Sequence, residues 1–282
     1  MDWLVTTEWL EKHADESNIV ILDCTRFVPD SEKNGFDEFL KSHIPTAQFI
    51  DLNVISDPKS PYANMLPSQN LFASECAKLG IKNDTHVIVY DSSYVSARLW
   101  WMFRVFGHQN ISILDGGLRK WKAENRPLEV GPAPARPMSS CFTVTLNPSS
   151  ILNIEEMKKA IKSGDTKVVD ARTPARFDGI EGSGYPGVPS GFMPGAINIH
   201  WGKFFDAENN FTFISLSKAA AIFETSGIDL SGKIVCTCGS GVTAALLGFM
   251  IERLGNKEWK LYDGSWHEWA QQVDTEKLTV KD

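Results

Sequence analysis

The stretch that decides the fold is Ile234–Ala244, which reads IVCTCGSGVTA. It starts with an apolar run, continues through Gly239 and Gly241, and leads into the apolar segment 245–251. This order predicts a buried strand, a tight loop and then a helix. Cys238 opens the loop, where backbone N–H groups and the positive end of the helix dipole favour a thiolate over a neutral thiol. We therefore predict that Cys238 is a nucleophile; the alternative is a small buried apolar residue.

Composition narrows the class of protein. The chain has 282 residues, of which 43% are hydrophobic, so it can form one large domain or two of ordinary size. A formal charge of -7 argues against a nucleic-acid surface and against anionic membranes. No apolar run reaches the roughly 18 residues of a membrane span, and the N-terminus lacks the pattern of a signal peptide. With five cysteines, an odd number, we expect a cytoplasmic protein with free thiols.

The chain repeats itself at a nearly constant offset. Segments of the first half that recur in the second, in the same order, are 20–23 with 168–170, 44–47 with 193–196, 87–91 with 234–238, and 115–121 with 263–269. Four pairs in one order indicate an internal duplication. Within each half, short β-rich runs alternate with amphipathic helical stretches, for which we expect helices at 98–106 and 219–225. This alternation predicts an α/β protein with two parallel sheets, each with helices on both faces.

A proline-rich stretch, 126–148, separates the halves and reads as a stiff linker. The predicted domains are 1–135 and 142–282. The repeat places Cys238 of the second domain opposite Asp91 of the first, and Gly239 opposite Ser92. A structural cysteine would more naturally be matched by another small apolar residue. The asymmetry therefore indicates one working copy and one supporting copy without a catalytic cysteine.

At this point the chain resembles the two-domain rhodanese-type sulfurtransferases, essentially from end to end. The loop Cys238–Ala244 is similar to the active loop of the 3-mercaptopyruvate branch, whereas thiosulfate-preferring relatives carry basic residues directly after the cysteine. Further matches are Trp100–Arg104, Leu114–Leu118, Ser60–Tyr62 with Met65–Pro67, and Tyr262–Trp266. The resemblance implies two tandem rhodanese-like domains and an enzyme that works without a cofactor or metal.

The resemblance also implies a reaction in two halves. The cysteine takes the outer sulfur of a small donor and becomes a persulfide, and a thiol acceptor, such as a thioredoxin-like protein, or cyanide removes it. The loop residues agree with this chemistry, because converging N–H groups can stabilise a persulfide anion. We expect the loop to consist of Gly239, Ser240, Gly241, Val242 and Thr243, with hydroxyls from two of them as extra donors.

Substrate binding departs from the family pattern. Arg176 matches one of two substrate-binding arginines in the family, and arginine binds carboxylates in a bidentate manner. The second arginine position falls on Tyr185, which donates one hydrogen bond but carries no charge. We assign both residues to the donor, with the site between the two domains. Arg172 is a nearby cation that we expect to pair with a surface carboxylate.

A proposed Asp–His–Ser relay of the mercaptopyruvate-specific members is also altered. Ser240 matches its serine, but the other two positions fall on Asn53 and Asn64, neither of which titrates near neutral pH. These departures leave the donor and the route of the proton open. Besides 3-mercaptopyruvate, we retain thiosulfate as a donor and a persulfide carrier that passes sulfur to a protein partner.

Other signals are set aside. A cysteine phosphatase needs an arginine six positions after its cysteine, and that position is Ala244. Cys236 is expected inside the sheet as a structural residue, because side chains alternate along a strand. The glycine-rich segment 182–187 contains a proline and no helix follows it, so we expect a loop and no dinucleotide site. Default structural roles are assigned to three histidines and three thiols: His43, His200, His267, Cys24, Cys76 and Cys141.

Overall fold

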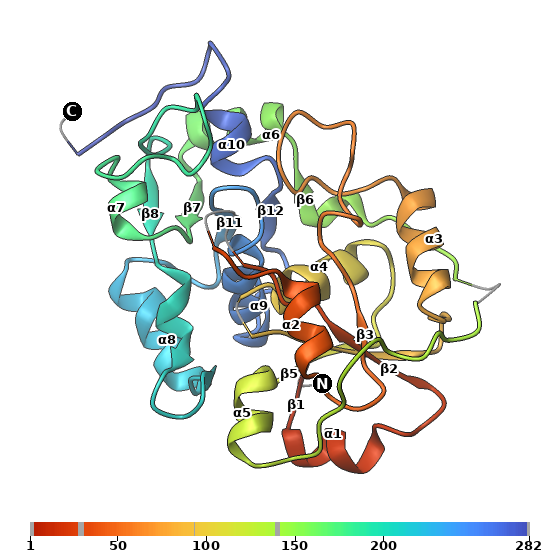
Figure 1. The fold of residues 1–282 in the computed structure, drawn as a ribbon. Coiled ribbons are helices and arrows are strands. Elements are labelled where there is room, and N and C mark those ends of the chain that lie inside the picture. The colour runs from red at the N-terminus through yellow and green to blue at the C-terminus, as the bar shows by residue number, and fades with distance from the viewer. Residues whose placement is uncertain (1–2, 28–30, 93, 139–141, 281–282) are drawn as a thin grey trace. The chain divides into compact units, whose positions relative to one another are not determined.

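The computed structural model describes residues 3–27, 31–92, 94–138 and 142–280 (Figure 1). The chain separates into two compact units. The first contains residues 1–58, 66–147 and 205–213, and the second contains 59–65, 148–204 and 214–282. Each half of the chain therefore contributes one short segment to the unit formed mainly by the other half. Cys141 lies outside the described residues.

The first unit is built on a parallel sheet of five strands. In spatial order these are β1 (Leu4–Val5), β5 (Ile111–Leu114), β4 (His86–Tyr90), β2 (Ile19–Asp23) and β3 (Gln48–Phe49). Its helices are α1 (Thr7–His13), α2 (Gly35–Lys41), α3 (Gln69–Lys78), α4 (Ser96–Val105) and α5 (Gly117–Ala123). A short antiparallel pair, β9 (Phe205–Asp206) and β10 (Thr212–Phe213), completes this unit.

Both faces of this sheet are covered. On one face, Ile21 and Tyr90 form a core with Leu10 of α1, Phe39 of α2 and Trp121 of α5. Because side chains alternate along a strand, the residues between them face the opposite side, where α4 packs on β4 and β5. Strands buried on both faces read as continuous apolar runs, which explains the run VIVY that ends β4.

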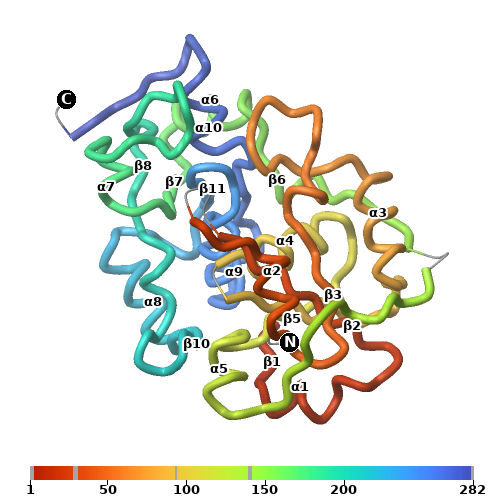
Figure 2. The backbone as a smooth tube through the Cα atoms, viewed as in Figure 1, coloured from red at the N-terminus to blue at the C-terminus, as the bar shows by residue number. Residues whose placement is uncertain are grey.

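The second unit repeats this plan. Its sheet has the order β6 (Ile151–Leu152), β12 (Lys260–Tyr262), β11 (Lys233–Thr237), β7 (Thr166–Asp170) and β8 (Ala196–Asn198). Its helices are α6 (Ile154–Ser163), α7 (Pro174–Phe177), α8 (Leu216–Thr225), α9 (Ala244–Arg253) and α10 (Ser265–Trp269), with 3-10 turns η1 (Pro148–Ser150) and η2 (Trp201–Phe204). Figure 2 traces the backbone of this unit through β7, α7 and β8.

Helices again cover both faces. Met157 of α6 and Trp266 of α10 pack with Val168 and Val235 on one face, while α9 packs against β11 and β12 on the other. The two strand orders correspond one to one along the chain, which confirms the predicted α/β fold with two parallel sheets and the internal duplication. The helices expected at 98–106 and 219–225 are α4 and α8. Within the described residues, no helix is both long and apolar enough to cross a bilayer.

Candidate active site

Cys238 lies at the end of a central strand of the second unit. Strand β11 ends at Thr237, and α9 begins at Ala244, so the predicted strand, loop and helix are all present. The side chain of Cys238 is only 2% exposed. The carboxyl ends of the strands in a parallel sheet are the usual place for a binding site, because the loops that follow the strands meet there.

The first residues of α10 hold this loop in place. The N–H of Cys238 donates to Ser265 Oγ (3.2 Å), and the same hydroxyl donates to the Tyr262 carbonyl (2.9 Å). The N–H groups of Trp266 and His267 donate to the carbonyls of Cys238 and Gly239, both at 2.9 Å. The first two residues of the loop are thus fixed through their main chain. Their amide geometry does not depend on their own side chains.

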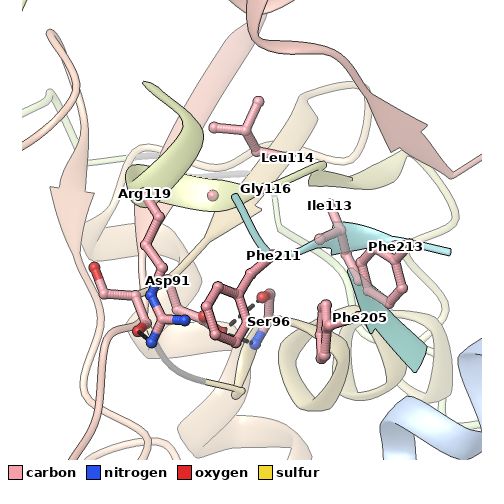
Figure 3. A pocket seen from close by; sticks show the side chains of 11 residues that line it. Asp91, Ser96, Ile113, Leu114, Gly116, Arg119, Phe205, Phe211 and Phe213 are labelled. Carbon is pink, nitrogen blue, oxygen red and sulfur yellow. Dashed lines mark hydrogen bonds between the residues drawn. The ribbon is translucent and has the colours of Figure 1, made fainter. Parts of the chain in front are cut away.

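The corresponding loop of the first unit binds an anionic group of its own. Asp91 follows β4 as Cys238 follows β11, and its Oδ2 accepts the N–H groups of Val95 and Ser96, both at 2.6 Å. The Ser96 hydroxyl also donates to this oxygen (2.7 Å), as Figure 3 shows. In the repeat, the two N–H donors correspond to residues 242 and 243. A loop of this kind can therefore hold a negative charge through main-chain donors at the start of a helix.

The hollow around Asp91 is small. It holds about 30 Å³, room for about one water molecule. Arg119 borders this hollow, with its guanidinium 4.0 Å from the centre of the Phe211 ring and its Nη2 donating to the Ser92 carbonyl (2.8 Å). The repeat aligns this arginine with His267 of the second unit.

Tyr185 lies directly over the loop of the second unit. A Cβ atom built on Gly239 would stand 3.1 Å from Tyr185 Oη and 3.4 Å from its Cε2. Both distances are tight for a Cβ atom, so the ring of Tyr185 crowds the space that a side chain at position 239 would take. The predicted donor-binding tyrosine and the predicted active loop are brought together.

His267 is a member of this cluster that the sequence assigned only a structural role. Its ring is stacked on Tyr185, with the ring centres 4.1 Å apart and the planes at 7°. Its Nδ1 accepts the N–H of Ala63 (2.9 Å), so the ring proton is on Nε2. Burial lowers the pKa of His267, which favours the neutral ring. The signal that could have found it is the repeat, in which His267 aligns with Arg119 at the equivalent loop.

Ser240 and Asn64 meet within the same unit. Asn64 Nδ2 donates to Ser240 Oγ over 2.6 Å, and both residues are buried. Asn64 has a φ of 61°, a left-handed conformation that asparagine adopts more readily than most residues. Asn53 belongs to the first unit, where it is exposed and its N–H donates to Asp51 Oδ1 (2.8 Å). The structure thus joins two of the three relay positions in one hydrogen bond.

Arg176 lies beside the tyrosine loop. It stands on α7, and a Cβ built on Gly184 would be 3.1 Å from its Nη1. Its side chain is 44% exposed, and Glu181 approaches its Nε at 4.0 Å. The guanidinium is therefore packed against the residue that precedes Tyr185 and is still open to solvent. A cation in this setting is available to a carboxylate.

Arg172 is paired, but its partner corrects the prediction of a surface carboxylate. Its Nη2 lies 2.7 Å from Oδ2 of Asp170, a residue of β7 that is fully buried, and its Nε also donates to that carboxylate. Nη2 donates in addition to the Gly191 carbonyl (2.9 Å), and the guanidinium lies 4.8 Å from the Trp266 ring centre. Strand β7 ends in three consecutive buried residues, Val168 to Asp170, so it carries this carboxylate into the interior.

Cys236 and the segment 182–187 lie in the elements that the sequence predicted for them. Cys236 lies inside β11 and is fully buried, and burial, with the Cys238 thiol nearby, raises its pKa well above the usual range. Segment 182–187 forms a loop held by Ser183, whose hydroxyl bonds to the Val188 carbonyl (2.9 Å). Cys24 and Cys76 are buried free thiols. The described part of the chain contains no group of three or more acidic, histidine and cysteine side chains placed to hold a metal ion.

Comparison with known proteins places this arrangement in a family. The Rhodanese-like domain matches the chain twice, over residues 6–124 and 153–272. The 3-mercaptopyruvate sulfurtransferase of Homo sapiens is 37% identical over 98% of this chain and 94% of its own. The thiosulfate sulfurtransferase of Bos taurus is 36% identical over 97% of this chain and 93% of its own.

Solved structures agree. The structure of SseA from Escherichia coli, described among 3-mercaptopyruvate sulfotransferases of the rhodanese fold, has a TM-score of 0.86 at 34% identity and covers 94% of this chain and 99% of that one. The Tum1 protein of Saccharomyces cerevisiae has a TM-score of 0.89 at 28% identity over 99% of this chain and 98% of its own. The chain therefore belongs to the rhodanese family, with two rhodanese-like domains in tandem.

Proposed function

We propose that this chain is a sulfurtransferase that takes the outer sulfur of 3-mercaptopyruvate onto Cys238 and delivers it to a thiol or cyanide. The single observation that carries this proposal is the position of Cys238 at the start of a loop whose first-unit counterpart holds an anion through its main chain. Relatives over nearly the whole chain bear the name 3-mercaptopyruvate sulfurtransferase.

The reaction balances without a metal or cofactor. The Cys238 thiolate attacks the thiol sulfur of 3-mercaptopyruvate, an S–S bond forms, and the C–S bond breaks. The electron pair of the C–S bond remains on carbon as the enolate of pyruvate, which takes up the thiol proton and leaves as pyruvate. An acceptor thiolate then attacks the outer sulfur, becomes a persulfide itself and releases Cys238 as a thiolate. Because the sulfur stays covalently bound to Cys238 between the two half-reactions, we expect ping-pong kinetics.

The neighbouring residues divide the remaining tasks. Main-chain N–H groups of Gly239 to Thr243 stabilise the terminal sulfur of the persulfide, as oriented donors do for other developing anions. Arg176 binds the carboxylate of the donor, and Tyr185 donates a hydrogen bond to the donor. Asn64 orients the Ser240 hydroxyl over 2.6 Å but takes no proton. The proton of the donor thiol therefore moves without an imidazole at position 64.

The test uses the purified, reduced chain with 3-mercaptopyruvate and, separately, thiosulfate. The mass of the Cys238 peptide and the release of pyruvate or sulfite are measured with and without a thiol acceptor. We expect an increase of one sulfur on Cys238 and pyruvate release from 3-mercaptopyruvate. Sulfur transfer that survives undiminished in Cys238→Ser would reject the proposal, and Cys236→Ser is the matched control because that thiol is buried in the strand.

Two other readings have specific support. Thiosulfate as donor is favoured by relatives that carry its name, such as the Bos taurus protein. A persulfide carrier, which loads sulfur and passes it to a thioredoxin-like protein, is favoured by the uncharged residues Asn53, Asn64 and Tyr185 at family-departing positions. Fast turnover with a small thiol would reject the carrier. Within the same proposal, the repeat copies are 1–135 and 142–282, and the chain acts in the cytoplasm.

A further inference from the structure

We propose that Tyr185, positioned by His267, occupies the place of a side chain at position 239 and so selects a singly charged α-keto acid donor over the thiosulfate dianion. This inference rests on the proposed function and names the substrate class of the same site. His267 is a positioning residue, whereas Tyr185 contacts the donor.

The first step is that the Tyr185 ring limits the space for a side chain at position 239. Gly241 has a φ of 76°, a left-handed conformation that by itself favours glycine. Gly239 has no such conformation, so its own backbone angles would accept other residues. The obstacle is instead the phenol ring, since a Cβ at position 239 would approach Tyr185 Oη to 3.1 Å. A longer, basic side chain at position 239 would therefore have to displace the Tyr185 ring.

The second step is that His267 fixes the phenol ring. The two rings are nearly parallel at 4.1 Å. His267 is itself held by its N–H bond to the Gly239 carbonyl and by the Ala63 N–H on its Nδ1, both at 2.9 Å. The Tyr62 ring meets the imidazole edge-on at 5.9 Å. Because these contacts fix the imidazole, the stack sets where the Tyr185 hydroxyl lies above the loop.

The third step concerns charge. Of the two arginines that the sequence places here, Arg172 is neutralised by the buried Asp170, whereas Arg176 is half-exposed beside Gly184. One cation and one neutral hydroxyl match a single carboxylate with a carbonyl next to it. A dianion needs a second positive charge; Gly239 supplies none, and the ring of Tyr185 crowds the place where a cationic side chain at this position would start. The site therefore discriminates by exclusion as well as by attraction.

The test measures kcat and KM for both donors, together with single-turnover loading of Cys238, in three variants. Tyr185→Phe removes only the hydroxyl, and we expect kcat/KM for 3-mercaptopyruvate to fall about fivefold to tenfold, the effect of one lost hydrogen bond. His267→Ala removes the stack, and we expect KM for 3-mercaptopyruvate to rise by a similar factor with kcat changed less than about twofold. His267→Phe keeps a stacked ring but leaves the Ala63 N–H without its acceptor.

The His267→Phe variant separates positioning from a merely structural role. We expect it to lower the melting temperature while KM stays near the wild-type value; a structural role would change KM alike in both His267 variants. His200→Ala is the matched control, because His200 is another half-buried histidine of the same unit whose pKa is lowered by burial. The double variant Tyr185→Gly, Gly239→Arg should raise the ratio of kcat/KM for thiosulfate to that for 3-mercaptopyruvate at least about tenfold.

The two proposals fail in different ways. If the wild-type chain is not loaded by 3-mercaptopyruvate, the proposed function is wrong and this inference falls with it. If the wild-type chain is loaded, but Tyr185→Phe, His267→Ala and the double variant leave the donor ratio within about twofold of wild type, only the role of the Tyr185–His267 stack is rejected.

Discussion

Two arginines four positions apart are expected to respond in opposite ways to the same substitution. Arg172→Met removes the guanidinium from a fully buried carboxylate, which loses bonds from Nε and Nη2 and is left without its counter-charge. Breaking a buried ion pair from one side costs about 3–5 kcal/mol. At about 2–4 °C per kcal/mol for chains of comparable size, the melting temperature should fall by about 6–20 °C.

Arg176→Met should leave the stability nearly unchanged and should instead weaken binding of the donor. The side chain is 44% exposed, so the free energy of unfolding should change by less than about 0.5 kcal/mol. Hydrogen bonds to a charged partner contribute about 1.5–3 kcal/mol, so the KM for 3-mercaptopyruvate should rise about tenfold to a hundredfold. Urea unfolding and steady-state kinetics at a temperature where both variants are folded measure the two effects separately.

A double variant, Asp170→Asn with Arg172→Met, serves as the control for the first substitution. It removes both charges and should recover part of the lost stability, because the uncompensated carboxylate is gone. A stable Arg172→Met with a raised KM, together with an unchanged KM in Arg176→Met, would refute the reasoning and exchange the two roles.

Three further predictions concern the rest of the chain. Asp91→Ala removes the acceptor at the start of α4 and should lower the free energy of unfolding, measured in urea, by about 1–3 kcal/mol. Persulfide loading of the second unit should not change. An equal loss of stability in Asp91→Asn would show that the charge of the carboxylate alone accounts for the effect. Gly248→Ala would place a Cβ 2.0 Å from the Trp259 ring. Although helix propensity favours alanine by about 1 kcal/mol, thermal unfolding should show a net loss of stability of about 1–3 kcal/mol. A gain in stability would contradict the clash. Burial raises the pKa of Asp23 to about 6, above its unfolded value of about 3.9. The folded chain therefore binds this proton more tightly, and the free energy of unfolding should fall by up to about 3 kcal/mol as pH rises from about 4 to about 6. Asp23→Asn should lack this part of the pH dependence.

The sequence predicted the elements well where a local pattern exists. The order of apolar run, glycine loop and helix located β11, the loop and α9, and the repeat anticipated two sheets with matching strand order. The helix expected at 98–106 is α4, but it is not amphipathic. Nearly all of its side chains are buried, including Arg98, whose guanidinium lies 4.6 Å from the Trp101 ring centre. Arg98 counts as a polar residue in the sequence pattern, but in the fold it is buried against an aromatic ring, so the pattern wrongly predicted a polar face.

The parts that the sequence could not supply depend on distant segments. Residues 59–65 belong to the second unit, far along the chain from α10, and only this arrangement brings Ala63 to His267. No period or motif encodes such a contact. The placement of Tyr185 over Gly239 is equally long-range, because a loop of irregular conformation carries the ring there. The pairing of Arg172 with Asp170 was within reach, since the two residues are separated by one position and Asp170 ends a strand.

The side chain that replaces the cysteine in the first unit has a further meaning. From Cα outward, an aspartate carries Cβ, Cγ and a charged oxygen, while a persulfidated cysteine carries Cβ, a first sulfur and a charged terminal sulfur. Asp91 thus resembles a persulfidated cysteine in length, and its Oδ2 accepts the two N–H groups whose counterparts in the repeat are those of residues 242 and 243. Asp91 therefore gives the first unit a stable mimic of the persulfide intermediate that we propose for Cys238. By the same reasoning, replacing a persulfidated cysteine with aspartate should give a stable mimic of the persulfide, just as acidic residues are used to mimic phosphoserine.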